Sequence, residues 1–156
     1  MKSFSFRTLF YLLFSLVFLA SCDWQDLPSY DEAEISAFQF YHRWASEEKD
    51  PITGEPVVKE KRLETKAEID SDNSIVSVEI QVPAASGDFT EAARSGVSLS
   101  KLWGQATIST AARITPLDGN ARLGTPDDWT KEKRFEVKAA NGDVRIWTVK
   151  VVGFVK

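Results

Sequence analysis

The sequence predicts an all-β domain, an antiparallel β-sandwich of about seven strands that closes with a C-terminal β-hairpin. Apolar and polar residues alternate with a period of two along most of residues 35–156, and helical periodicity is nearly absent. Turn-forming residues interrupt this alternation at the short intervals that are typical of a sandwich. The chain has 156 residues, of which 43% are hydrophobic and 27% charged, a composition that suits one globular domain.

The first predicted strand, residues 35–44, is half-buried. Its two faces are Phe38, Phe40, His42 and Trp44 on one side and Ala37, Gln39, Tyr41 and Arg43 on the other. Residues 46–56 combine charges with two prolines and a glycine, which predicts a loop. Residues 57–65 then predict an exposed strand, whose lysines would discourage pairing with another sheet edge.

The middle of the chain predicts one clear strand and several shorter elements. Residues 70–73 form a turn, and residues 74–82 alternate valine and isoleucine with polar residues until Pro83 ends the strand. Residues 88–94 predict one short helical turn, capped by Asp88 or Thr90. Two further extended segments are expected at residues 97–103 and 106–114.

The C-terminal segment predicts a β-hairpin. Phe135 and Val137 alternate with polar residues up to Asn141-Gly142, and the returning strand carries Trp147 on the same face as two valines. Asn-Gly favours a type I′ turn, because both central residues of that turn need a positive φ.

The first 21 residues predict a cleaved signal peptide. Lys2 and Arg7 precede an apolar run over residues 9–20, which is shorter than the roughly 20 residues of a membrane-spanning helix. The tetrad Leu-Ala-Ser-Cys ending at Cys22 resembles the lipobox of bacterial lipoproteins. That resemblance implies that Cys22 becomes the acylated N-terminal residue, held to the membrane by its acyl chains.

Residues 22–34 predict a short acidic tether, and residues 35–156 the folded domain. An acidic stretch soon after the lipidated Cys resembles the export signal of Bacteroidetes lipoproteins that reach the outer face of the outer membrane. The resemblance implies an outer-membrane lipoprotein that faces the cell exterior. The alternative is retention at the inner membrane, with Asp23 as the retention signal.

Residues 35–152 resemble the Ig-like domains of Bacteroidetes surface lipoproteins. The segments that carry this resemblance are VSVEIQVP (76–83), VSLSKLWGQATIS (97–109), TPLDG (115–119) and the closing hairpin from Asp128 to Val151. It implies an Ig-like β-sandwich in a protein that accompanies a SusC/SusD-type uptake system, as an accessory or substrate-capturing subunit for an oligosaccharide or a peptide. The alternative function is a structural or adhesive lipoprotein of the fimbrial or surface-layer type.

Composition argues against several other functions. The formal net charge of −4 offers no basic surface for nucleic acid. A single His and a single Cys, the latter in the lipobox, leave no motif for a catalytic triad, so we expect no enzymatic activity and no cofactor. The run Asp70 to Asn73 lacks the glycine and the distal glutamate of a calcium loop, so we expect no metal site.

Aromatic residues are the best candidates for a binding surface, because flat and rigid rings pack against sugars or peptides at little entropic cost. Trp44, Trp103 and Trp129 fall at predicted strand ends or in loops, and Tyr41 lies on the polar face of the first strand. We therefore predict that ligand binding uses some of these four residues. The alternative is that each of these tryptophans fills one end of the core; Trp147 is expected to be a core residue.

Overall fold

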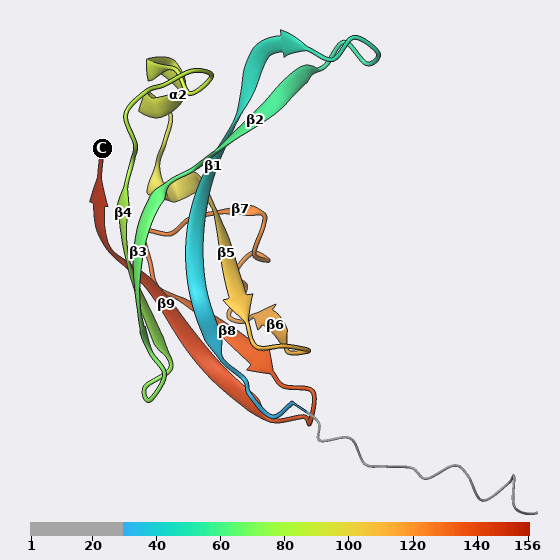
Figure 1. Ribbon diagram of the computed structural model, residues 1–156, viewed down its shortest axis with the longest axis vertical. Coiled ribbons are helices and arrows are strands. Elements are labelled where there is room, and N and C mark those ends of the chain that lie inside the picture. The colour runs from blue at the N-terminus through green and yellow to red at the C-terminus, as the bar shows by residue number, and fades with distance from the viewer. Residues whose placement is uncertain (1–29) are drawn as a thin grey trace, which may run out of the picture.

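Two β-sheets packed face to face form the body of the protein in the computed structural model, which describes residues 30–156 (Figure 1). Sheet A has the strand order β2 (Pro56–Arg62), β1 (Ile35–Lys49), β5 (Leu102–Ile108) and β7 (Pro126–Asp127). Sheet B has the order β3 (Glu64–Asp70), β4 (Ile75–Gln81), β9 (Val144–Val155), β8 (Lys133–Lys138) and β6 (Arg113–Pro116). The predicted all-β sandwich is confirmed, with nine strands among the described residues where about seven were expected.

The described residues contain little helix. The short helix α2 (Glu91–Ser95) and the 3₁₀ helix η1 (Leu99–Lys101) connect β4 to β5. Within residues 30–156 no helix is long and apolar enough to cross a bilayer. The predicted signal peptide and Cys22 lie outside the described residues.

The core lies between the sheets and follows the predicted alternation. Phe38, Phe40 and His42 of β1 are buried, whereas Tyr41 and Arg43 point outward and are partly exposed. The opposing sheet contributes buried residues from β4, β8 and β9: Val76, Val78, Ile80, Phe135, Val137, Trp147 and Val149. Period-two patterning therefore identified the buried face of each of these strands.

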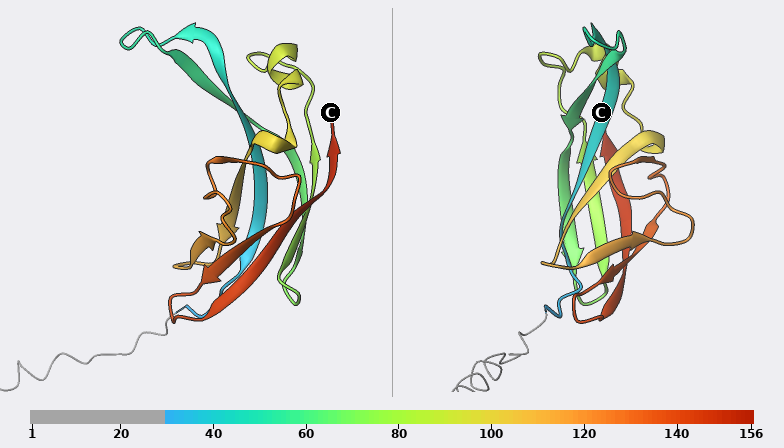
Figure 2. Two further views of the ribbon diagram at one scale, coloured as in Figure 1. Left: turned by 180° about the vertical axis from the view of Figure 1, so that it is seen from behind. Right: turned by 90° about the vertical axis from the view of Figure 1, so that its right-hand side faces the viewer.

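Strands β1 and β2 continue beyond the sandwich as a projecting hairpin, which we call the arm (residues 42–61; Figures 1 and 2). The predicted loop at 46–56 is wrong in its first part, because β1 continues to Lys49 and pairs with Pro56. Only residues 50–55 form the turn. The Asp50 carboxylate closes it by accepting hydrogen bonds from the backbone N–H groups of Ile52 and Thr53, both at 2.8 Å.

The single strand predicted at residues 57–65 is two strands that belong to different sheets. Leu63 separates β2 from β3, and its side chain is 1% exposed. Its backbone N–H donates to the carbonyl of Phe40 at 2.9 Å. Because Leu63 is the only large apolar residue between Lys59 and Ile69, burying it between the sheets turns the chain from sheet A into sheet B.

Sheet B departs from the predicted all-antiparallel arrangement at one pair of strands. β4 and β9 run parallel, with Ile75 opposite Thr148 and Gln81 opposite Val155. β9 also pairs with β8 in the predicted antiparallel hairpin. Hence β9 occupies the centre of sheet B, just as β1 occupies the centre of sheet A between β2 and β5.

The β8–β9 hairpin forms, but the predicted type I′ turn is wrong. Gly142 donates its N–H to the carbonyl of Ala139 at 3.1 Å, and Ala139 donates to Asp143 at 2.8 Å. Gly142 has a φ of 100°, whereas Asn141 does not take a positive φ. The turn is therefore a three-residue loop that ends in a glycine bulge, the common alternative for an Asn-Gly sequence.

The two extended segments expected at residues 97–103 and 106–114 have different boundaries in the structure. Residues 99–101 form η1, and β5 runs from Leu102 to Ile108 in sheet A. A turn follows, in which Ala112 donates its N–H to the carbonyl of Ser109 at 3.1 Å. The chain then enters sheet B as β6. The chain crosses from one sheet to the other at Leu63 and again between β5 and β6. The alternation of polar and apolar residues indicates neither crossing.

Candidate functional site

Tyr41 and Trp103 lie side by side on the outward face of sheet A. The two residues are directly opposite in the β1–β5 register, and both are partly exposed. Their neighbours Phe40 and Leu102 point inward and are fully buried. Successive side chains of a strand alternate between faces, so burial of these neighbours places the two rings on the outside of the sandwich.

Arg43 links the Trp103 ring to a carboxylate of the neighbouring strand. The guanidinium carbon of Arg43 lies 5.7 Å from the ring centroid of Trp103, and its Nε contacts the Glu60 carboxylate at 2.5 Å. Tyr41 donates its hydroxyl proton to Oε1 of Gln39 at 3.0 Å. We call this surface the aromatic face: Gln39, Tyr41, Arg43, Glu60 and Trp103. The two rings were predicted from the sequence as candidate binding residues, but the arginine and the carboxylate were not.

Trp44 lies on the other side of sheet A, at the inner face of the arm. Its ring stacks on that of His42, with centroids 5.8 Å apart and planes 12° apart, and lies 5.5 Å from the ring of Phe89. A hollow of about 520 Å³ runs between the arm and the segment from Gly87 to α2, and a second of about 390 Å³ adjoins it. Both are lined by Trp44, Lys59 and Asp88, and we call them together the Trp44 groove.

Lys59 joins the two walls of the Trp44 groove. Its ammonium group lies 3.1 Å from the carboxylates of both Glu48 on the arm and Asp88 opposite. The hydrogen bonds to Asp88 and Glu48 raise the pKa of Lys59, so the ammonium form is favoured there. This network was not predictable from local sequence patterns, because its members come from β1, β2 and the segment after β4.

Beneath Trp44 lies His42, which is 7% exposed and whose Nδ1 has no hydrogen-bond partner. Burial lowers the pKa of His42, and the positive charges of Lys101 and Lys156 lower it further, against a backbone contact with Ala93 that raises it. His42 is therefore held neutral in the folded protein at a pH where the unfolded chain already binds a proton.

Stability is expected to fall as the pH drops from 7 to 5, because the unfolded chain takes up a proton at His42 before the folded protein does. The loss begins near the unperturbed pKa of about 6.5 and is complete below the lowered pKa of the folded state. Urea denaturation at pH 7, 6 and 5 measures it. His42→Phe should flatten this part of the profile, and an unchanged slope in that variant would show that other groups cause it.

Trp129 is not a surface residue, so the prediction that it helps present a binding surface is wrong. Its side chain is 3% exposed, and its indole N–H donates to the carbonyl of Leu102 at 3.2 Å. Its ring packs edge-on against Phe40, with centroids 4.8 Å apart. Gly104 makes room for this ring, since it contributes no side chain to the inward face of β5.

A buried ion pair holds the segment that carries Trp129. Lys133 is 6% exposed, and its ammonium group lies 2.8 Å from the Asp127 carboxylate and 5.5 Å from the centroid of the Trp129 ring. Burial alone would raise the pKa of Asp127, but hydrogen bonds from Lys133 and two backbone N–H groups hold it below the usual value. Both charged groups therefore have a structural role at the edge of the core.

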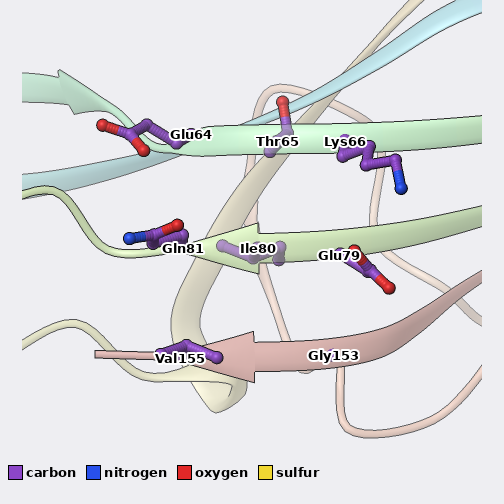
Figure 3. Close-up of a pocket in the computed structure, with 8 residues that line it drawn as sticks. All are labelled: Glu64, Thr65, Lys66, Glu79, Ile80, Gln81, Gly153 and Val155. Atoms are coloured by element: carbon purple, nitrogen blue, oxygen red, sulfur yellow. The ribbon is translucent and has the colours of Figure 1, made fainter.

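A third hollow, of about 520 Å³, lies on the outer face of sheet B (Figure 3). It opens at Gly153, where β9 lacks a side chain beside Glu79 of β4. Figure 3 shows it bordered by polar side chains of β3 and β4 and by Val155, with no aromatic ring among them. This surface offers hydrogen-bonding groups but no apolar platform to orient a ligand.

The described residues contain no group of three or more His, Cys, Asp or Glu side chains placed to hold a metal ion. In the turn from Asp70 to Asn73, the Asp70 carboxylate accepts hydrogen bonds from both the backbone and the side chain of Asn73. These bonds lower the pKa of Asp70 and use its oxygens within the turn. The geometry of residues 30–156 thus offers two aromatic surfaces, the aromatic face and the Trp44 groove.

Comparison with known proteins assigns this chain to a protein family. The model of the DUF5018-related family matches residues 35–150, which include eight strands completely and most of β9. The chain belongs to the DUF5018-related family. No curated protein matches it.

A crystal structure of a Bacteroides fragilis protein, described as "a putative secreted protein", is similar to this DUF5018-related chain. The two share 50% sequence identity with a TM-score of 0.76, over 83% of this chain and all of the other. This relative agrees with the Bacteroidetes lineage that the sequence resemblance implied.

Proposed function

We propose that this protein is a non-catalytic lipoprotein of the cell surface, which acts beside a SusC/SusD-type transporter as an accessory, substrate-capturing subunit. The observation that carries this proposal is the aromatic face, which places a tryptophan, a tyrosine and an arginine on one outward sheet surface. These three residue types contribute most of the binding energy in protein interfaces. We assign the aromatic face to the contact with the transporter.

The Bacteroides fragilis relative, described as "a putative secreted protein", supports a location outside the cytoplasm. The position of Tyr30, where the described chain begins, also supports an anchor at Cys22. The Tyr30 carbonyl accepts a hydrogen bond from the N–H of Asn141, so the chain enters the sandwich at the β8–β9 turn. Eight residues, 22–29, span at most about 28 Å, which keeps this end near the membrane. A tether this short raises the effective concentration of the protein at a neighbouring transporter.

The sheet topology argues against the fimbrial alternative. Assembly by donor-strand exchange needs a terminal strand that can leave its sheet, or a sheet with a missing strand. Here the first strand, β1, and the last, β9, are each paired on both sides. Neither strand can leave without dividing its sheet, so an accessory role beside a transporter suits this topology better.

The double variant Tyr41→Ala/Trp103→Ala is expected to lose the transporter subunits when the intact lipoprotein is purified from detergent-solubilised outer membranes. The wild-type protein should recover a SusC/SusD-like pair in constant proportion by mass spectrometry. Loss of two central aromatic contacts should reduce that recovery by tenfold or more, since such residues contribute about 2 kcal/mol or more each.

The matched control is Val144→Ala/Ile146→Ala, which removes two exposed apolar residues from β9 on the other sheet. This control should recover the transporter as the wild type does. Purification of the wild-type lipoprotein without any transporter subunit would refute the proposed role.

A further inference from the structure

The Trp44 groove is a formed cleft at the end of the sandwich opposite the chain entry. In Figure 1 the arm and the segment around α2 lie at one end, and the described chain begins, in blue, at the other. The larger hollow, about 520 Å³, falls within the range of roughly 300–1,000 Å³ that is typical of small-molecule sites. A protein anchored through its N-terminal segment would therefore point this cleft away from the membrane.

Charged groups of both signs line the groove. Lys59 and Lys61 lie on its β2 side, Glu47 and Glu48 lie on the β1 side of the arm, and Asp88 faces Lys59 from the opposite wall. Glu60 also borders the groove, and its carboxylate pairs with Arg43. The carboxylates disfavour an anionic ligand, and the two lysines oppose a cationic one. A neutral ligand avoids both repulsions.

The groove also offers two kinds of complementary surface. The half-buried Trp44 supplies ring surface for a ligand's C–H groups, and Phe89, which is 2% exposed, packs against it. The side chains of Glu48 and Asp88 are 64% and 75% exposed, so their oxygens retain free lone pairs after pairing with Lys59. Those oxygens accept hydrogen bonds from hydroxyl groups, and Lys59 donates to hydroxyl oxygens.

We propose that the Trp44 groove binds a neutral oligosaccharide, with a sugar ring against Trp44 and its hydroxyl groups hydrogen-bonded to Asp88, Glu48 and Lys59. This inference rests on the proposed substrate-capturing role and names the substrate class. It separates ligand binding, at the groove, from transporter contact, at the aromatic face on the opposite side of sheet A.

An extended peptide fits the groove less well. A peptide that binds by strand addition needs an open backbone edge. The nearest edge is that of β2, where Lys59, Glu60, Lys61 and Arg62 are consecutive charged residues. Such charges are typical of strands that resist pairing with another chain.

The test is isothermal titration calorimetry with the purified full-length lipoprotein in detergent. The probes are short malto-, cello-, xylo- and manno-oligosaccharides, an acidic galacturonate oligomer and a cationic oligolysine. At least one neutral oligosaccharide should bind. Asp88→Ala should weaken that binding by about tenfold or more, because a sugar hydroxyl loses its charged acceptor. Glu68→Ala, which removes an equally exposed carboxylate from β3, should leave it unchanged.

Three results would overturn the inference: no binding by any neutral oligosaccharide, equal binding by Asp88→Ala and wild type, or tighter binding of the acidic or cationic probe. Because the Asp88 side chain is 75% exposed, the variant should fold as the wild type does, and circular dichroism checks this. The transporter pull-down distinguishes the two proposals. Asp88→Ala should still recover the transporter, and Tyr41→Ala/Trp103→Ala should still bind the oligosaccharide.

Discussion

Trp147→Ala is expected to lower the free energy of unfolding by about 4 kcal/mol or more. The side chain of Trp147 is fully buried at the centre of sheet B, and replacing a buried tryptophan by alanine typically costs about 3–5 kcal/mol. Its indole N–H also donates to the carbonyl of Ala33 at 2.9 Å. The variant leaves that carbonyl without its partner, which adds about 1–3 kcal/mol if the group stays buried.

Urea denaturation followed by far-ultraviolet circular dichroism measures the effect, and Trp103→Ala is the matched control. Trp103 lies on the outward face of sheet A and is partly exposed, so its loss should cost no more than about 1 kcal/mol. Equal destabilisation by the two variants would contradict the assignment of Trp147 to the core and of Trp103 to the surface.

Gly104→Ala is expected to destabilise the fold by about 2–3 kcal/mol, although it adds only one methyl group. A Cβ atom at this position would lie 2.5 and 2.9 Å from two carbons of the Trp129 ring and 3.2 Å from a carbon of Phe38. The Trp129 ring cannot easily move, because its N–H is bonded to Leu102 and its edge packs on Phe40. The substitution must therefore displace the core.

Gly153→Ala is the control for this prediction, because it makes the same change in a strand of the other sheet. The added Cβ would meet only the Glu79 side chain and backbone, at 3.4 Å or more, in an open part of the surface. Its thermal unfolding midpoint should stay close to that of the wild type, while that of Gly104→Ala falls by several degrees. A tolerated Gly104→Ala would mean that Trp129 has room to shift.

The faces of individual strands were predictable from the sequence, because burial on one side of a sheet imposes alternation on each strand separately. Phe38 and Phe40 were correctly assigned to the core, and Tyr41 to the outward face. The assignment of strands to sheets was not predictable. The transfer at Leu63 and the parallel pairing of β4 with β9 depend on contacts between distant segments, to which local patterning is insensitive.

The candidate site, too, was predictable residue by residue but not in its arrangement. Tyr41 and Trp103 were identified as separate aromatic candidates, but their side-by-side position depends on the β1–β5 register. Trp129 was misjudged because its segment has no alternation to indicate burial. The space it occupies is created by Gly104, 25 positions earlier in the chain. The groove network of Lys59 and Asp88 joins β2 to a segment beyond β4, so only the folded arrangement brings it together.

The central position of β9 bears on when the protein can fold. During synthesis β9 is made after every other strand of the sandwich, yet it is the strand that joins β4 to β8 in sheet B. Until the ribosome has added it, the β3–β4 and β6–β8 pairs remain separate and the core lacks Trp147. Pairings between distant segments also form slowly. For a chain with the predicted secretion signal, this order of synthesis delays folding of the sandwich until β9 has been made, and so favours passage through the translocation channel while still unfolded.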